Sequence, residues 1–231
     1  MPLEREVDFM PEKFPRTLVG GVSLPRLIAG TNWFLGYSHT SLAKDQFIQE
    51  FQTRDRIAAI LEMFLKNGVD AVMTPLSALL EEAIGEAEQR AGQRMIRILT
   101  PSFAPLAAEG KPESPERAFD RCAALGATFC LPHQSVTDAL VDRLSGSIRQ
   151  LDRLSRLIRA RGMIPGLSTH MPETIVLADK TDADVETYIQ IYNSAGFLMQ
   201  VEADWVMHII QNAKKPVMTI KPLAAGKLLP V

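Results

Sequence analysis

The chain has 231 residues, of which 46% are hydrophobic, and a formal net charge of −2 at pH 7. This length and apolar content suit one domain with a substantial core, and the near-neutral charge argues against a nucleic-acid partner. No apolar run could span a bilayer, and the acidic N-terminus lacks the basic and apolar regions of a signal peptide. Two cysteines, Cys122 and Cys130, are too few for a disulfide framework. We therefore expect a cytoplasmic protein with reduced thiols and no membrane partner.

A β-hairpin is predicted at the start of the chain, where two strand-like runs flank Gly20 and Gly21. Glycine pairs are typical of tight hairpin turns because both central residues can adopt positive φ. A long segment, residues 32–52, follows the next strand-like run. Long segments without regular structure often serve as lids or binding loops.

Beyond the hairpin, short β-branched runs alternate with helical segments, a pattern that predicts parallel βα units. Seven strands are expected at residues 27–31, 69–73, 95–100, 127–131, 163–168, 197–201 and 216–220. Helices are expected at residues 53–67, 77–91, 114–126, 137–144, 147–161, 183–193 and 204–212, with helical turns from Pro172.

This order predicts an α/β fold, a TIM-type (β/α) barrel with an N-terminal β-hairpin. A closed barrel of this type has eight strands. We therefore expect residues 1–231 to form a single barrel domain that lacks the eighth strand and is incomplete at its C-terminal end. Because an unpaired edge invites pairing with another strand, a homo-oligomer or absent C-terminal residues are expected to cover it.

The segment at residues 166–174, GLSTHMPET, follows the fifth predicted strand and resembles the G-V-S-N-H-x-P-E-x segment of the aldo-keto reductases. Further segments resemble that family in the same chain order, at residues 17–31, 68–85, 129–133, 198–202 and 218–228. The resemblance covers nearly the whole chain after residue 15. It implies the barrel fold of that family, with the functional site at the C-terminal ends of the strands.

The resemblance carries over only part of the family's chemistry. In aldo-keto reductases a tyrosine donates a proton to the carbonyl, supported by a lysine, an aspartate and a histidine. The aspartate, tyrosine and lysine positions fall on Met73, Ala78 and Pro101, while His133 keeps the histidine. A carbonyl that receives hydride must be protonated or have its oxyanion stabilised, so ordinary NADPH-dependent aldehyde reduction is not expected.

The cofactor implied by the resemblance is NADP. The family holds the nicotinamide carboxamide with serine, asparagine and glutamine, which fall on Ser168, Thr169 and Gln200. The aromatic residue that stacks on the nicotinamide ring falls on Ile220. We therefore expect these three polar residues to bind a cofactor, if one is bound.

Polar residues at the predicted strand ends supply the candidate catalytic groups His133, Lys221 and Glu202. Gln200 and Glu202 are two apart on a predicted strand, so they share a face. Lys221 ends the neighbouring predicted strand, and we expect it to pair with Glu202 and stay charged. The alternatives are a hydrogen-bonded structural role for His133 and a helix-start role for Glu202. A desolvated Lys221 amine that forms a Schiff base is a further alternative.

Four more residues are candidates for substrate binding: Thr31, Asn32, Tyr37 and His170. Tyr37 could also replace the missing acid, and His170 could instead cap the following helix. Histidines and acids near the strand ends could ligate a metal by type, but no local spacing signature supports one, so no metal is predicted.

Three functions remain open from the sequence. The first is an enzyme with atypical chemistry on a small carbonyl or anionic substrate, bound in a polar pocket at the strand ends. The second is a catalytically silent ligand-binding or regulatory barrel. The third is a lyase or hydrolase that uses a lysine Schiff base or a metal. In each of them the partner is a small molecule.

Overall fold

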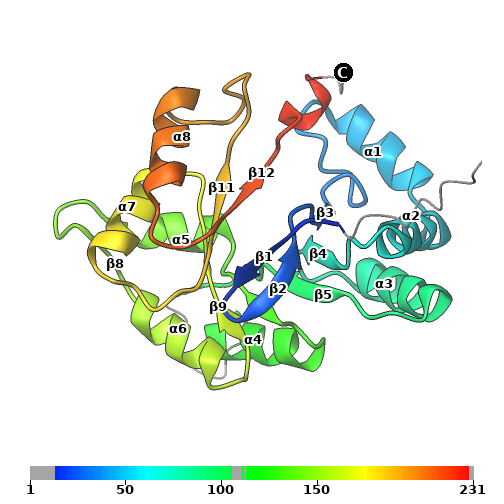
Figure 1. The fold of residues 1–231 in the computed structure, drawn as a ribbon, viewed down its shortest axis with the longest axis horizontal. Coiled ribbons are helices and arrows are strands. Elements are labelled where there is room, and N and C mark those ends of the chain that lie inside the picture. The colour runs from blue at the N-terminus through cyan, green and yellow to red at the C-terminus, as the bar shows by residue number, and fades with distance from the viewer. Residues whose placement is uncertain (1–13, 106–110, 112, 229–231) are drawn as a thin grey trace, which may run out of the picture.

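The computed structural model describes residues 14–105, 111 and 113–228. Two parallel sheets, of five and three strands, form its curved central wall, and helices lie on the outside of this wall (Figure 1). The strands of the wall are β3 (Ala29–Gly30), β4 (Ala71–Thr74), β5 (Ile96–Leu99), β6 (Phe129–Cys130), β9 (Ile164–Pro165), β10 (Leu167–Ser168), β11 (Tyr188–Ile191) and β12 (Val217–Ile220).

Within each of the two sheets, β3-β4-β5-β6-β9 and β10-β11-β12, the strands pair in chain order and every pair is parallel. The fifth predicted strand is divided at Gly166 into β9, which pairs with β6, and β10, which pairs with β11. Within the described ranges β12 and β3 do not pair with each other. The expected α/β fold with a parallel sheet is confirmed, and the barrel wall is open between its last and first strands.

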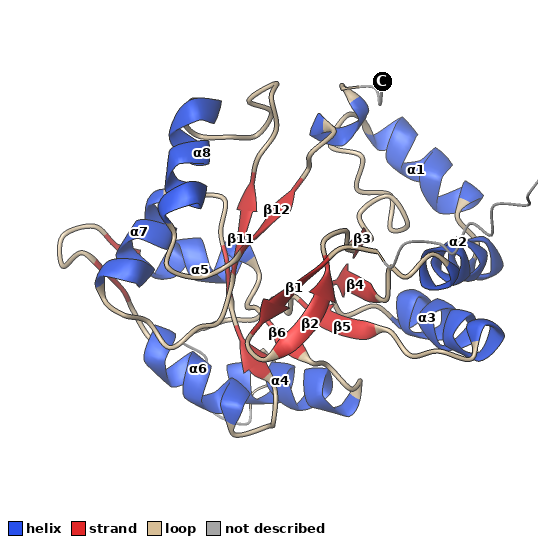
Figure 2. Ribbon diagram, in the orientation of Figure 1, coloured by secondary structure: helices blue, strands red, loops and turns tan. Residues whose placement is uncertain are grey.

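The outer layer consists of helices that follow the strands (Figure 2). They are α1 (Leu42–Phe51), α2 (Arg54–Lys66), α3 (Ala78–Ala91), α4 (Pro115–Ala124), α5 (Gln134–Thr137), α6 (Leu151–Arg159), α7 (Glu173–Lys180) and α8 (Ala203–Asn212), with the 3-10 helices η1 (Asp138–Leu140) and η2 (Ala224–Gly226). The start of α4 is as predicted: the Ser114 side chain accepts a hydrogen bond from the Arg117 N–H, and Pro115 occupies the first turn.

The predicted hairpin is confirmed as β1 (Arg16–Val19) paired with β2 (Val22–Pro25), with Gly20 and Gly21 at its turn. Val19 and Leu24 pack with Phe129 and other side chains of the barrel interior. The hairpin therefore closes the end of the barrel opposite to the strand C-termini.

Two adjoining predictions were wrong. Residues 183–193, predicted as a helix, contain strand β11, and residues 197–201, predicted as a strand, form a loop. The spacing of Val185, Ile189 and Tyr192 fits one face of a helix. However, pairing with β10 and β12 on either side makes the segment a central strand that is buried on both faces.

Smaller differences concern loops and helix starts. The predicted loop at residues 32–52 contains α1, whose first turn is capped by the Ser41 hydroxyl. The helix predicted from residue 147 begins at Leu151, because β7 (Val141–Asp142) and β8 (Ser147–Ile148) pair as a second hairpin. The short helix predicted at residues 137–144 lies earlier, as α5 and η1.

Gly166 marks a close approach between three strands of the wall. A Cβ atom there would lie 2.6 Å from Leu131 Cγ and 2.9 Å from Thr187 Cγ2. Both neighbours are themselves buried, so neither can move aside freely. This packing is the physical reason for a glycine at the start of the GLSTHMPET segment.

We predict that Gly166→Ala lowers the free energy of unfolding by about 1–3 kcal/mol, because it overpacks the wall. Gly85→Ala is the matched control, since a Cβ atom at this exposed position of α3 meets no atom within 4 Å. That control should raise the stability by up to about 1 kcal/mol through helix propensity. Urea unfolding of the three proteins measures both effects, and equal stability of the two variants would contradict the packing argument.

Candidate functional site

The C-terminal ends of the parallel strands gather at one end of the barrel, which is called the barrel mouth below. In barrels of this type, functional side chains come from these strand ends and from the loops that follow them. Lys221 directly follows β12, His170 lies just after β10, and His133 comes three residues after β6. His39 reaches the same region from the segment between β3 and α1, as its electrostatic interaction with Lys221 indicates.

Lys221 is the electrostatic centre of the mouth. It is half-buried, and burial lowers the pKa of its amine. No carboxylate of the described chain lies within salt-bridge distance of it. The predicted pair with Glu202 is therefore not formed. Glu202 is an exposed residue that precedes α8 and follows a loop rather than a strand.

The charge of Lys221 lowers the pKa values of three histidines. Burial and then the charge of Lys221 lower the pKa values of His39 and His133. The same two causes, followed by the charges of His133 and His39, lower the pKa of His170 to about 4. The four side chains are therefore close enough for a charge on one to affect the protonation of the others. Because the histidine pKa values lie below 6.5, the imidazoles are mainly neutral at pH 7.

His133 is held in one tautomer. Its Nδ1 atom accepts a hydrogen bond from the Ser135 backbone N–H at 3.3 Å and lies 2.8 Å from Ser135 Oγ. Because an amide N–H can only donate, Nδ1 is unprotonated, and the proton of the neutral ring sits on Nε2. His133 thus caps α5 and also presents an N–H donor, so the structural role and the site role foreseen for it are compatible.

Asp138, on η1, is a charged residue of the mouth that sequence reasoning missed. Its carboxylate accepts hydrogen bonds from the Thr169 hydroxyl and from the His170 backbone N–H, the latter at 3.1 Å. Burial raises the pKa of Asp138 despite these two donors. The only available signal was one acid within the apolar run of residues 136–141, VTDALV. Thr169 Oγ1 also lies 3.0 Å from the Met171 carbonyl oxygen, so this hydroxyl is already engaged within the protein.

Gln190, rather than Gln200, is the glutamine on the wall next to the GLSTHMPET segment. The parallel register places Ser168 opposite Ile189, so Thr169 lies beside Gln190. The Gln190 side chain is fully buried; its Nε2 donates to the Ile191 carbonyl at 3.3 Å, and its Oε1 has no partner within the described residues. Gln200 is exposed in the loop after β11. The match to Gln200 followed from the misplaced strand at residues 197–201.

The other candidates lie along the segment that begins after β3. Thr31 is buried, and its hydroxyl donates to the Met73 carbonyl at 3.0 Å, which joins β3 to β4. Asn32 and Tyr37 are exposed, and the Tyr37 N–H donates to the Asn32 carbonyl at 2.8 Å. Asn32 Nδ2 lies 3.4 Å from His39 Nε2. Substrate binding by these residues stays a prediction.

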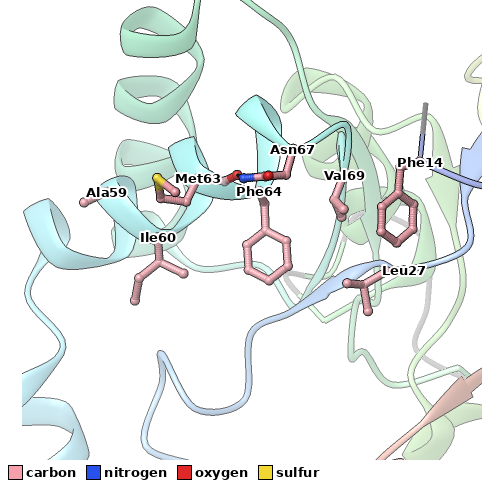
Figure 3. A pocket seen from close by; sticks show the side chains of 8 residues that line it. All are labelled: Phe14, Leu27, Ala59, Ile60, Met63, Phe64, Asn67 and Val69. Carbon is pink, nitrogen blue, oxygen red and sulfur yellow. Dashed lines mark hydrogen bonds between the residues drawn. The ribbon is translucent and has the colours of Figure 1, made fainter. Parts of the chain in front are cut away.

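A separate apolar groove of about 530 Å³ runs along the outer flank of α2 (Figure 3). Ile60, Met63 and Phe64 of α2 line it together with Leu27 and Val69, which precede β3 and β4. These side chains offer no ionisable group. The groove lies outside the wall, near the N-terminal ends of β3 and β4, and it has no ionisable side chain. The barrel mouth is therefore the better candidate for a catalytic site.

Within the described ranges, no three histidine, cysteine, aspartate or glutamate side chains are arranged to hold a metal ion. No helix of this part of the chain is long and apolar enough to cross a membrane.

The lowered histidine pKa values predict a stability that depends on pH. Each of the three imidazoles has a folded pKa below its unfolded value of 6.5. The unfolded chain therefore binds more protons in this range, and stability is complete above pH 6.5 and falls as the pH drops towards about 4. Urea midpoints at pH 7.5 and pH 5 measure the loss.

His170→Gln should reduce this loss, because it removes the most strongly shifted histidine. His208→Gln replaces an exposed histidine of α8 and should keep the loss seen in the parent protein. A His170→Gln protein that loses as much stability as its parent between these pH values would contradict the prediction.

No family model matches this chain, and no curated protein matches it. Solved structures do. An aldo/keto reductase from Brucella melitensis matches with a TM-score of 0.56 and 15% identity over 91% of this chain and 74% of that one. An aldo-keto reductase from Bacillus halodurans, in its holo form, has a TM-score of 0.56 and 16% identity over 94% of this chain and 70% of that one.

A third match is an aldo-keto reductase from a deep-sea metagenome library of the Medee basin. It has a TM-score of 0.53 and 11% identity, over 92% of this chain and 69% of that one. At sequence identities this low, structural similarity shows a shared fold and says nothing of a shared activity. The chain has the fold of the aldo-keto reductases, as the resemblance of its segments implied.

Proposed function

We propose that this aldo-keto-reductase-like barrel is an enzyme that binds a small anionic or carbonyl substrate at its mouth. The observation that carries the proposal is the half-buried Lys221, which follows β12, lacks a carboxylate partner in the described chain and lowers the pKa values of three histidines. Such a group of donors without an acid is unusual in a structural role, because a buried charge normally has a partner.

The mouth suits an oxygen atom that carries negative charge. The Lys221 ammonium loses solvation when it is buried, and an anion bound against it would offset that loss. The Nε2–H of His133 supplies a neutral hydrogen-bond donor. A substrate with a carboxylate, a phosphate or a polarised carbonyl can use both groups.

The chemistry proposed differs from ordinary aldo-keto reduction. Of the residues at the aspartate, tyrosine and lysine positions of the resemblance, Met73 packs in the interior apolar cluster and Ala78 begins α3. Pro101, at the lysine position, is buried. None of these side chains can donate a proton to an oxyanion.

A nicotinamide cofactor is implied by the resemblance, and the residues present fit it only in part. The unpartnered Oε1 of Gln190 could accept an amide N–H, and Ser168 lies at the end of β10. The Thr169 hydroxyl, however, is already bonded to Asp138, and Ile220 offers no aromatic face. We therefore propose no step through NADP.

A catalytically silent ligand-binding barrel is the second candidate. The absence of acid, tyrosine and lysine side chains at positions 73, 78 and 101 favours it. It would use the same Lys221 site for binding, so turnover of a bound carbonyl compound separates the two candidates.

We predict that Lys221→Gln weakens the binding of small anions by about 10-fold or more, the usual range for a lost charged hydrogen bond. Isothermal titration with inorganic phosphate, pyruvate and glyoxylate measures the affinities. Lys180→Gln, at an exposed lysine that ends α7, is the matched control and should bind as the parent does. Equal affinities of the two variants, or no binding of any probe to the parent, would refute the Lys221 site.

NADPH consumption with methylglyoxal and a panel of other small aldehydes should stay far below the usual enzyme scale of about 1 per second. The physical reason is that the tyrosine acid has no replacement at position 78. If turnover does reach that scale, Tyr37→Phe decides whether the exposed Tyr37 supplies the proton.

A further inference from the structure

We infer that Lys221 is a nucleophile that forms a Schiff base with the carbonyl carbon of a small 2-oxo acid or aldehyde. The inference rests on the proposed function and specifies both its substrate class and its reaction. It is carried by the position of Lys221 at the meeting point of four strand ends and by the absence of an acid beside it in the described chain.

The backbone at Lys221 is unusual. Its φ is +58°, in the left-handed region that residues other than glycine rarely adopt. The turn is held by the Ala224 N–H, which donates to the Lys221 carbonyl at 2.9 Å, and by the Tyr192 N–H, which donates to the Ile220 carbonyl at 3.2 Å. Such strain persists only where surrounding structure enforces it, and it is common at functional sites.

Lys221 is half-buried at the edge of the wall where the parallel strands end. Its charge acts on His39, His133 and His170, which follow three other strands, β3, β6 and β10. A lysine directed to the outer helical layer would not interact with side chains from three separate strand ends. The mouth therefore brings the amine and three neutral imidazoles together.

The Lys221 amine has no ion-pair partner in the described chain. Two other lysines differ in this respect: Lys66 pairs with Glu62, and Lys214 Nζ donates to the Asp179 carbonyl at 2.7 Å. Lys221 has no carboxylate that would hold its proton, and burial lowers its pKa, so more of it is unprotonated near neutral pH than of an exposed lysine. Only the unprotonated amine can attack a carbonyl.

The reaction balances without an oxidant or reductant. The amine nitrogen attacks the carbonyl carbon and forms a C–N bond, while the proton lost by nitrogen ends on the carbonyl oxygen and gives a carbinolamine. The remaining N–H proton then moves to the hydroxyl oxygen, the C–O bond breaks with its electron pair on that oxygen, water leaves, and a C=N bond remains on Lys221. The neutral imidazoles of His133 and His170 are the neighbouring groups that can relay the proton.

Reductive trapping tests the inference. The full chain is incubated with pyruvate, glyoxylate or methylglyoxal and sodium cyanoborohydride at pH 7.5, and adducts are located by intact mass and peptide mapping. We expect the adduct on Lys221 to form before adducts on exposed lysines such as Lys180, because more of the half-buried Lys221 amine is unprotonated.

Lys221→Arg provides the separating variant. Its guanidinium keeps the charge that binds anions but cannot form a Schiff base. We expect this protein to bind pyruvate and to lose the fast adduct, whereas Lys180→Gln keeps both properties.

The outcomes distinguish the two proposals. Binding of a carbonyl probe that depends on Lys221, without an adduct on Lys221, would overturn the Schiff base and leave the proposed function standing. Equal labelling of Lys221 and exposed lysines would overturn it as well. No binding of any probe would overturn both.

Discussion

The arrangement of the barrel mouth depends on one half-buried carboxylate. Asp138 lies on η1, a few residues after His133, and accepts hydrogen bonds from Thr169 and His170 in the loop after β10. The short segment from His133 to Asp138 therefore joins two strand ends: it carries one histidine and fixes the backbone that carries another. Burial raises the pKa of Asp138, and the hydrogen bonds from Thr169 and His170 partly offset that rise because they favour the charged carboxylate.

The distribution of ion pairs sets the mouth apart from the rest of the molecule. Arg16 pairs with Asp70 beside the N-terminal hairpin, and Arg97 pairs with the buried Glu88 of α3. On the outer surface Arg159 bonds two acids. Lys221, by contrast, is half-buried and has no carboxylate within salt-bridge distance in the described chain. In the proposed function a ligand meets this charge, as in barrels whose sites lie at the strand C-termini.

The aldo-keto-reductase fold explains why this end holds the functional groups, but not which reaction they perform. The interior is filled by Met73 and other apolar side chains together with the hairpin residues Val19 and Leu24. The chemistry must therefore come from the loops and strand ends above that core. The polar groups there include a lysine and histidines, and the proposed nucleophilic amine is consistent with them.

Local signals in the sequence determined the hairpin at Gly20 and Gly21, the helix that begins at Ser114 and Pro115, and the order of parallel βα units. Each of these follows from backbone preferences of a few neighbouring residues. Sequence also placed His133 and Lys221 at strand ends, because both follow short β-branched or apolar runs.

Tertiary structure alone decided the rest. Residues 183–193 carry apolar spacing that suits a helix as well as a strand, and only pairing with β10 and β12 selects the strand. Because residues 188–191 form the strand, the glutamine buried in the wall is Gln190 and not Gln200. For the same reason Glu202 lies before α8, after a loop, and does not pair with Lys221. The bond between Asp138 and the loop at residues 169–170 spans about thirty residues, and no local pattern encodes it. Burial and partners are long-range properties, so the state of the Lys221 amine could be read only from the folded chain.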